Sequence, residues 1–329
     1  MFKLIVNEFN KYFNRPGTYI MLAIIVAIMI LGVVLNNQFS NDGDNKSYDK
    51  DWKTEVKSDI QKYEKRLVQI SKKPEDKRSL SEISDEMTLG DKVSKLKYYL
   101  KKDTQPPASN NFYQHLLDTG GLLSFVTIMI IIMSSGLMSR EHQQGTIKLL
   151  LIRPASRLKI FFSKYLYILI ASLIFLMFTY GVSALIALFT TKMNPTQYLA
   201  VQGPSGYKMV NVFELLGQQL FANYLFIITF AIIAYALSVI FKHTALSLGV
   251  TFALMFFGDL VMLFLKGKTK FLEFFWPANW NLAQYLPNSP SELIDKDLSF
   301  GFSLTYDLIA LMLITVIAAW IFNKRDVAN

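Results

Sequence analysis

The sequence has 329 residues, of which 52% are hydrophobic and 18% are charged, and its net charge is +9. This composition is too apolar for an ordinary soluble domain and predicts a membrane protein. The basic residues are dispersed over loops beside apolar runs and accompany no nucleic-acid-binding motif, so we do not expect nucleic acid as a partner. Cysteine is absent, which excludes disulfides, thiolate metal sites and a cysteine nucleophile.

The chain begins with an amphipathic segment. Within residues 2–14, apolar side chains recur at helical spacing, as at Ile5, Phe9 and Tyr12, which predicts a helix lying in the membrane interface. We assign residues 1–17 to this cytoplasmic interfacial helix, which serves either as a simple anchor or as a lateral brace beside a docked partner. The apolar run that follows is longer than the core of a signal peptide and lacks its small-residue cleavage site, so we expect an uncleaved first span.

Six apolar stretches are long enough to cross the hydrocarbon core of a bilayer, which takes roughly 20 residues. They lie at residues 18–36, 119–138, 160–189, 220–241, 244–265 and 305–322. We therefore predict an all-α polytopic membrane protein with six transmembrane helices.

The basic residues of the short loops predict the orientation of these spans. They precede the first span and occur between the second and third, between the fourth and fifth, and in the tail at residues 323–329. All four segments are therefore expected on the cytoplasmic side. Both termini would then be cytoplasmic in a multi-pass protein of a bacterial cell membrane.

Residues 37–118 form a loop too long for the charge rule, and we expect them outside the cell as a helical domain. Amphipathic patterns predict one helix over Asp51–Ser71 and a second from Leu80 to Leu100, interrupted near Gly90. The two helices would form a hairpin with a small core, which favours packing against a second copy. Its mixed charges fit either a solvated face or contact with a substrate.

Two further segments are expected on the outer side. Residues 190–219 contain Asn194-Pro195 and Gly203-Pro204-Ser205-Gly206, which we interpret as an irregular loop. Residues 266–304 contain aromatic residues interrupted by prolines. That composition suits the membrane interface or a re-entrant segment before the last span.

Motifs for chemistry within the chain itself are missing. No G-x-x-x-x-G-K-[ST] or H-E-x-x-H sequence occurs, so we expect neither a nucleotide site nor a metal site. Phe257-Gly258-Asp259 and Tyr306-Asp307 resemble fragments of intramembrane aspartyl proteases, but Phe256 replaces the first glycine and the order is reversed. We therefore predict no catalytic residue. Asp259, an ionisable residue inside a span, either lines a translocation path or makes a structural hydrogen bond.

The most informative segment runs from Ser139 to Lys164, between the second and third spans. It is too basic to cross a bilayer, yet it contains an apolar run that ends at Pro154. This pattern predicts a short amphipathic helix on the cytoplasmic face, where a soluble partner docks. We assign residues 139–159 to this coupling segment.

The same segment resembles the ABC type-2 permease family. The resemblance rests on Arg140-Glu141, Gly145-Thr146, the apolar run Ile147–Ile152, Pro154-Ala155-Ser156-Arg157 and Lys164, in that order. The six-span layout, the amino-terminal helix and the aromatic segment before the last span are also similar to that family.

The resemblance implies several partners besides membrane lipid. One is a second permease copy, identical or paralogous, and another is a separate cytoplasmic ABC ATPase that binds ATP and magnesium. Glu141–Leu151 would form the coupling helix that contacts this ATPase. The contact residues so implied are Arg140, Glu141, Gly145, Thr146, Lys148, Leu149, Leu150, Arg153 and Arg157.

We therefore expect a non-enzymatic permease subunit of an ATP-driven exporter. The outer domain is larger than the loop of minimal family members, which favours peptides, drugs or ions over simple polysaccharides or lipid-linked glycans. Because aromatic and Met-rich span surfaces adapt to apolar cargo, amphipathic or antimicrobial-type peptides or hydrophobic drugs are the expected substrates. Three alternatives remain: export of sodium or another small solute by the same architecture, a membrane sensor or scaffold with a ligand-binding outer domain, and a self-sufficient secondary transporter.

Overall fold

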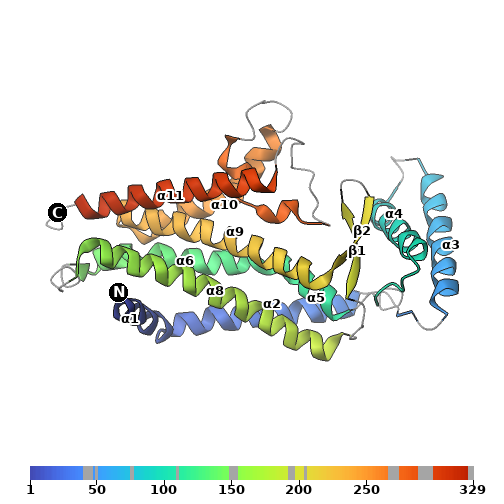
Figure 1. The fold of residues 1–329 in the computed structure, drawn as a ribbon, viewed down its shortest axis with the longest axis horizontal. Coiled ribbons are helices and arrows are strands. Elements are labelled where there is room, and N and C mark those ends of the chain that lie inside the picture. The colour runs from blue at the N-terminus through green and yellow to red at the C-terminus, as the bar shows by residue number, and fades with distance from the viewer. Residues whose placement is uncertain are drawn as a thin grey trace. The chain divides into compact units, whose positions relative to one another are not determined.

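A computed structural model describes residues 1–39, 47–48, 51–74, 78–108, 111–147, 155–191, 197–203, 206–265, 274–287 and 299–324. The chain is mostly helical and divides into two compact units (Figure 1). The bundle unit comprises Met1–Val34, Asp118–Ala184 and Gln218–Asn329. The hairpin unit comprises Leu35–Leu117 and Leu185–Gly217.

The described chain contains six helical stretches that are long and apolar enough to cross a membrane, as the sequence predicts. Their bounds are Pro16–Leu35, Phe112–Gln143, Arg157–Thr190, Val212–Phe241, Thr244–Met262 and Phe300–Lys324. The helices concerned are α2 (Pro16–Phe39), α5 (Phe112–Asp118), α6 (Leu123–Gln143), α8 (Arg157–Thr190), α9 (Val212–Phe241), α10 (Thr244–Leu265) and α11 (Phe300–Lys324). A 3-10 turn, η2 (Thr119–Leu122), joins α5 to α6, so the second stretch is longer than the predicted span.

Helix α9 forms the centre of the bundle unit. In the most apolar stretch of α9, 72% of the residues are buried within the chain, whereas the corresponding share in α2 is 17%. Phe230 and Ile233 of α9 pack with Ile131 of α6 and Met255 of α10. Because α9 also packs on α8 and α11 through a second cluster that includes Ile232, it is surrounded by protein on several sides.

The aromatic segment before α11 packs into this core. Its described part, residues 274–287, contains the short 3-10 helices η4 (Trp276–Ala278) and η5 (Leu282–Tyr285). Trp280 is only 1% exposed, and its ring centroid lies 4.9 Å from that of Phe230. A Cβ atom at Gly258 of α10 would overlap the Trp280 ring, so the glycine makes room for the indole.

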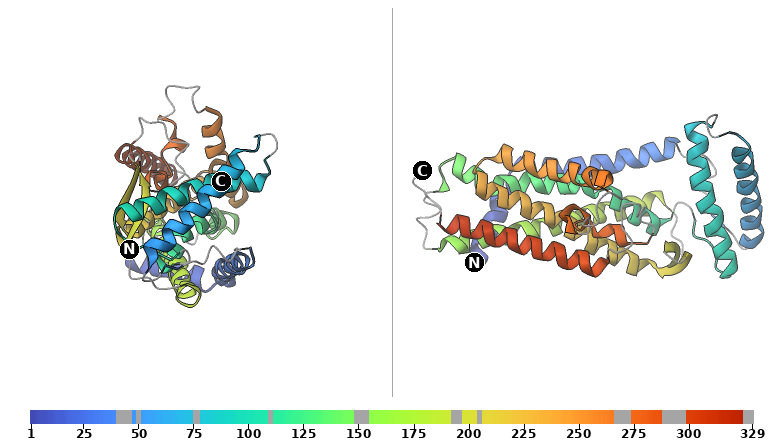
Figure 2. Two further views of the ribbon diagram at one scale, coloured as in Figure 1. Left: turned by 90° about the vertical axis from the view of Figure 1, so that its right-hand side faces the viewer. Right: turned by 90° about the horizontal axis from the view of Figure 1, so that it is seen from above.

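In the hairpin unit, α3 (Trp52–Ser71) and α4 (Leu80–Lys101) lie side by side (Figure 2). They cover nearly the stretches that the sequence predicts, but α4 continues through Gly90 without interruption. Apolar residues of both helices form the core, and ion pairs link their surfaces, including Lys97 Nζ to Glu64 Oε1 at 2.7 Å. That this unit lies outside the cell stays a prediction.

The prediction of an all-α chain with an irregular loop at residues 190–219 is wrong in one respect. Strands β1 (Tyr198–Gly203) and β2 (Gly206–Asn211) pair antiparallel, with Val201 opposite Lys208. The two residues between the strands, Pro204 and Ser205, lie outside the described residues, and Gly206 at the start of β2 has a φ of +106° that favours glycine. Alternating β-forming residues on both sides of the Gly-Pro-Ser-Gly sequence were the overlooked signal.

We predict that Gly258→Ala destabilises the bundle unit, because the added methyl group must displace the buried Trp280 ring. Overpacking of this kind costs about 1–3 kcal/mol. The matched control is Gly249→Ala on the same helix, where an added Cβ has no neighbour within 4 Å. Thermal unfolding of both purified variants in detergent should show a lower midpoint for Gly258→Ala alone, and equal midpoints would contradict the packing argument.

Candidate functional site

Five side chains from three helices and one turn form what we call the anchor cluster. They are Glu8 and Lys11 of α1 (Phe2–Phe13), Glu141 of α6, Thr146 just after α6, and Lys164 of α8. The cluster lies where α1 meets the beginning of α8 and the end of α6, close to the chain's N-terminus in Figure 1. It therefore joins both ends of the connection between α6 and α8 to the first helix.

Lys164 is the centre of the cluster and is completely buried. Its Nζ atom donates to Glu8 Oε1 at 2.8 Å and to Glu141 Oε1 at 3.4 Å. A buried ammonium group without partners is very unfavourable, so the two carboxylates are what make this position tolerable. Each carboxylate in turn depends on the lysine, because Glu8 and Glu141 are only 5% and 3% exposed.

Glu141 has two further partners besides Lys164. Its Oε1 accepts a hydrogen bond from Lys11 Nζ, and its Oε2 accepts one from Thr146 Oγ1. The bond to Lys11 ties α1 to α6, and the bond to Thr146 fixes the chain immediately beyond α6. One carboxylate thus holds three separate pieces of backbone together.

Aromatic contacts add to the docking of α1. The ring of Tyr12 stacks on that of Tyr167 of α8 at 5.2 Å, and Phe9 contacts the same ring edge-on at 4.9 Å. Burial raises the pKa of Tyr12 well above its usual range, so its phenol stays neutral. The face of α1 that contains Glu8 and Tyr12 is therefore turned to protein, whereas Phe2 is 79% exposed.

Gly145 ends helix α6. Its φ of +67° lies in the left-handed region, and its backbone N–H donates to His142 O at 3.1 Å. The chain then places Thr146 against Glu141 and buries Ile147, which is 5% exposed. The Gly-Thr pair found in the sequence therefore consists of a residue that stops the helix and a residue that binds its last turn.

Besides Gly145, the predicted contact residues fall into three groups. Glu141 and Thr146 belong to the anchor cluster, while Lys148, Leu149, Leu150 and Arg153 lie outside the described residues. The Arg140 side chain folds back over Gly136, since a Cβ added there would meet its Nε atom at 2.7 Å. Arg157 Nη1 donates to the backbone oxygen of Asn323 in α11 at 3.2 Å.

One boundary prediction needs correction. Glu141 to Gln143 are the last residues of α6, so a separate coupling helix cannot begin at Glu141. The left-handed turn at Gly145 separates α6 from whatever follows it. With its carboxylate buried among intramolecular partners, Glu141 is a positioning residue rather than a surface contact.

Asp259 and Asp307 differ in what the structure says of them. Asp259 lies on α10, but its side chain is outside the described part. Asp307 of α11 is buried, and it accepts hydrogen bonds from Trp276 Nε1 at 2.9 Å and Thr229 Oγ1 at 2.8 Å. Asp307 therefore connects η4, α9 and α11, a role that sequence reasoning missed.

Sequence reasoning also missed Glu8 and Lys11 as site residues. Glu8, Lys11 and Tyr12 are spaced three and four residues apart and so share one face of α1. Two opposite charges beside an aromatic residue on that face were the available signal. The lysine inside the apolar run of α8 was another, because a buried charge requires a partner.

Comparison with known proteins places this architecture in a family. Residues 83–328 match the family described as "Protein of unknown function (DUF2705)". The chain belongs to this family. The DUF2705 chain is 28% identical to the "Uncharacterized protein YhcI" of Bacillus subtilis (strain 168), over the whole length of both chains.

A second relative of the DUF2705 chain has an informative name. The "Uncharacterized membrane protein YdbK" of the same organism is 28% identical over 218 residues, which cover 66% of this chain and 84% of that protein. Together with the six apolar helices, this relative indicates that the DUF2705 chain is a membrane protein.

We predict that Lys164→Met strongly destabilises the protein, because it leaves Glu8 and Glu141 buried without their shared cation. Removing one member of a buried ion pair costs about 3–5 kcal/mol. Lys159→Met on the same helix is the control, since Lys159 is exposed. The yield of monodisperse protein and its melting temperature in detergent should fall for Lys164→Met and stay unchanged for Lys159→Met.

A combined variant separates the loss of charge balance from a simple loss of volume. In Glu8→Gln/Glu141→Gln/Lys164→Met the buried carboxylates are also neutral. We expect this triple variant to recover part of the stability that Lys164→Met loses. A triple variant less stable than the single one would contradict the ion-pair account.

Proposed function

We propose that this chain is the membrane-spanning permease subunit of an ATP-driven exporter of the ABC type-2 kind. The anchor cluster is the observation on which the proposal depends. It fixes the connection between α6 and α8 to the helices on both of its sides and to α1. A connection held in this way is suited to transmit a movement of a docked partner to the helices of the bundle.

The physical reason lies in the burial of the cluster. Exposed ion pairs contribute little and break easily, whereas separating a buried pair leaves charges without solvent. Movement of the residues after Gly145 therefore shifts α6, α8 and α1 together instead of bending the chain between them. Rigid coupling of this kind is what a transporter needs when its energy source is a separate subunit.

The sequence supports a separate energy source. It contains no G-x-x-x-x-G-K-[ST] motif, so ATP and magnesium would bind to a partner ATPase. The basic residues of the connection between α6 and α8 suggest that it faces the cytoplasm, where that ATPase is found. Lys148, Leu149, Leu150 and Arg153 are the proposed contacts, and Gly145 and Thr146 set their position.

A second copy of a permease would complete the transport path. Three of the apolar helices are poorly covered within the single chain. The buried share of the most apolar stretch is 17% in α2, 29% in α10 and 28% in α11. Their exposed apolar side chains must contact either lipid or another permease copy, identical or paralogous. In the proposed assembly the substrate passes between the two copies, in a bacterial cell membrane with both termini in the cytoplasm.

The proposed substrates are amphipathic or antimicrobial-type peptides, or hydrophobic drugs. Large and flexible apolar side chains adapt to varied apolar cargo, and Phe257, Met312 and Trp320 are exposed on the spans. Sodium or another small solute transported by the same architecture would be an alternative outcome. A sensor that modulates an ATPase without moving a substrate would be another.

The decisive experiment pairs the chain with its ATPase. We expect a P-loop ATPase encoded nearby to co-purify with the tagged chain. Inside-out vesicles containing both proteins should take up a fluorescent amphipathic peptide when ATP is present. ATPase modulation without uptake of any tested solute would favour a sensor, and the absence of any associated ATPase would refute the proposal.

We predict that Arg153→Glu weakens association with the ATPase, because a reversed charge at an interface replaces an attraction with a repulsion. Losing a close interfacial charge pair costs about 2–5 kcal/mol, enough to reduce co-purification at least about tenfold. Lys57→Glu, an exposed charge reversal on α3, is the matched control. Equal recovery of ATPase with both variants would remove Arg153 from the interface.

A further inference from the structure

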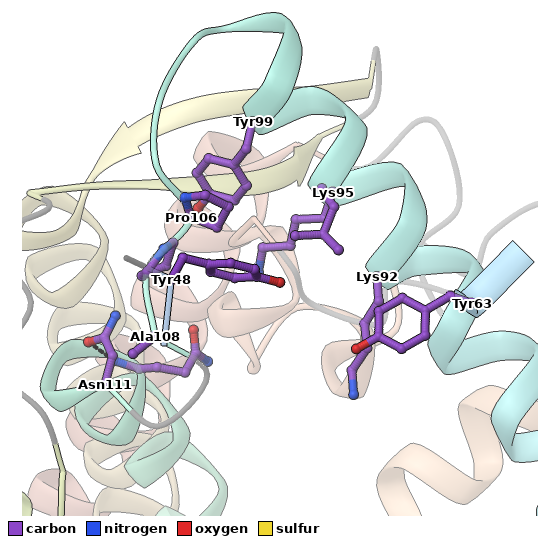
Figure 3. A pocket seen from close by; sticks show the side chains of 11 residues that line it. Tyr48, Tyr63, Lys92, Lys95, Tyr99, Pro106, Ala108 and Asn111 are labelled. Carbon is purple, nitrogen blue, oxygen red and sulfur yellow. Dashed lines mark hydrogen bonds between the residues drawn. The ribbon is translucent and has the colours of Figure 1, made fainter. Parts of the chain in front are cut away.

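The hairpin unit contains a pocket with a volume of about 230 Å³ (Figure 3). Its walls come from α3, α4, the chain between α4 and α5, and the beginning of α5. The lining residues are Tyr48, Tyr63, Lys92, Lys95, Leu96, Tyr99, Pro106, Pro107, Ala108, Asn111 and Gln114. Aromatic rings and prolines thus form an apolar surface with a few polar groups around it.

Hydrogen bonds hold the aromatic walls in place. Gln105 Nε2 donates to the backbone oxygen of Tyr48 at 2.6 Å, and the Tyr48 hydroxyl donates to Asp59 Oδ2 at 3.1 Å. The Tyr99 hydroxyl accepts a bond from the backbone N–H of Ala200 in β1 at 2.8 Å. The pocket is therefore formed before any ligand arrives, as is usual for small-molecule sites.

Asn111 supplies a polar group that the fold itself does not use. Its Oδ1 accepts bonds from the backbone N–H groups of Tyr113 at 2.6 Å and Gln114 at 3.3 Å, which determines the orientation of the amide. Its Nδ2 is buried and has no hydrogen-bond partner within the described part of the chain. A buried donor without a partner is unfavourable, and a ligand with an acceptor atom would relieve that cost.

The charges around the pocket select the kind of acceptor. Lys92 and Lys95 line it, and its described lining contains no carboxylate. Burial raises the pKa of Tyr99 to about 12, and burial together with Asp59 raises the pKa of Tyr48 above its usual range. Both hydroxyls are therefore neutral at physiological pH, and the charged side chains in the described lining are the two lysines.

The volume limits the size of the ligand. Pockets for drug-sized molecules measure roughly 300–1,000 Å³, so this pocket suits a smaller group. One aromatic or large apolar residue with its terminal group is of this order.

We propose that this pocket binds an aromatic or large apolar group that bears a carboxylate, the chemistry of a peptide's C-terminal residue or of a free aromatic acid. The apolar part packs against Tyr48, Tyr99 and Pro106. The carboxylate lies near Lys92 and Lys95, and Asn111 Nδ2 donates to a ligand oxygen. This site goes beyond the permease function and stands even if the chain moves no substrate.

Binding can be measured on the full-length chain in lipid nanodiscs by ligand-detected NMR titration. N-acetylphenylalanine should bind, whereas N-acetylphenylalanine amide, which lacks the carboxylate, should bind roughly tenfold more weakly because a charge-assisted hydrogen bond is lost. 3-Phenylpropionate distinguishes the two sources. Weaker binding than N-acetylphenylalanine assigns the site to peptide ends, and equal binding assigns it to free aromatic acids.

Variants test the named residues. Lys95→Gln should weaken binding of N-acetylphenylalanine several-fold, while Lys97→Gln, on the same helix but outside the pocket and paired with Glu64, should not. Asn111→Asp keeps the oxygen that caps α5 but replaces the donor with a negative oxygen, so it should abolish binding. If Asn111→Asp fails to fold, Lys95→Gln still decides.

Two results would overturn the proposal. One is equal affinity for the acid and its amide, which would leave the lysines without a role. The other is absence of saturable binding by both N-acetylphenylalanine and 3-phenylpropionate to protein whose elution profile is that of the folded chain. Neither result depends on ATPase association or on transport, so this site and the permease function can fail separately.

Discussion

The fold of the bundle unit depends on one buried cation. Lys164 has no contact with solvent, and its ammonium group is stabilised by carboxylates from two other helices. Apolar packing alone would allow α1 to slide along the bundle, because the hydrophobic effect has no direction. Two ion pairs of α1, Glu8 with Lys164 at 2.8 Å and Lys11 with Glu141, remove that freedom and place α1 in one position. Aromatic stacking on Tyr167 then strengthens an arrangement that the charges have already selected.

Helices are predicted well from the sequence where one pattern of apolar residues extends over a long segment. The six apolar stretches and the helix over Trp52–Ser71 are of this kind, since burial of one face or of a whole span is a local property. The β-hairpin was missed because its strands are only six residues long and flank the sequence Gly203-Pro204-Ser205-Gly206, which is typical of an irregular loop. Short strands owe their stability to neighbours, which no local pattern contains.

The anchor cluster illustrates the same limit at the level of the site. Thr146 and Glu141 are close in the sequence, and a motif containing both was visible there. Glu8 and Lys164 are 156 residues apart, so their pairing is a property of the packed bundle. A lysine within an apolar run predicts that a carboxylate partner exists, but it does not identify which carboxylate that is. Gly258 is a similar case, because its reason for being a glycine is the distant Trp280 ring.

The separation between Glu8 and Lys164 also has a consequence for biogenesis. At about 5–20 residues per second, a ribosome needs roughly 8–30 s to synthesise the chain between them. During that time α1 has no buried cation to pair with, and its amphipathic face can rest in the membrane interface. Docking of α1 must therefore follow insertion of α8. Although α1 is the first helix to be synthesised, it is one of the later helices to reach its final position.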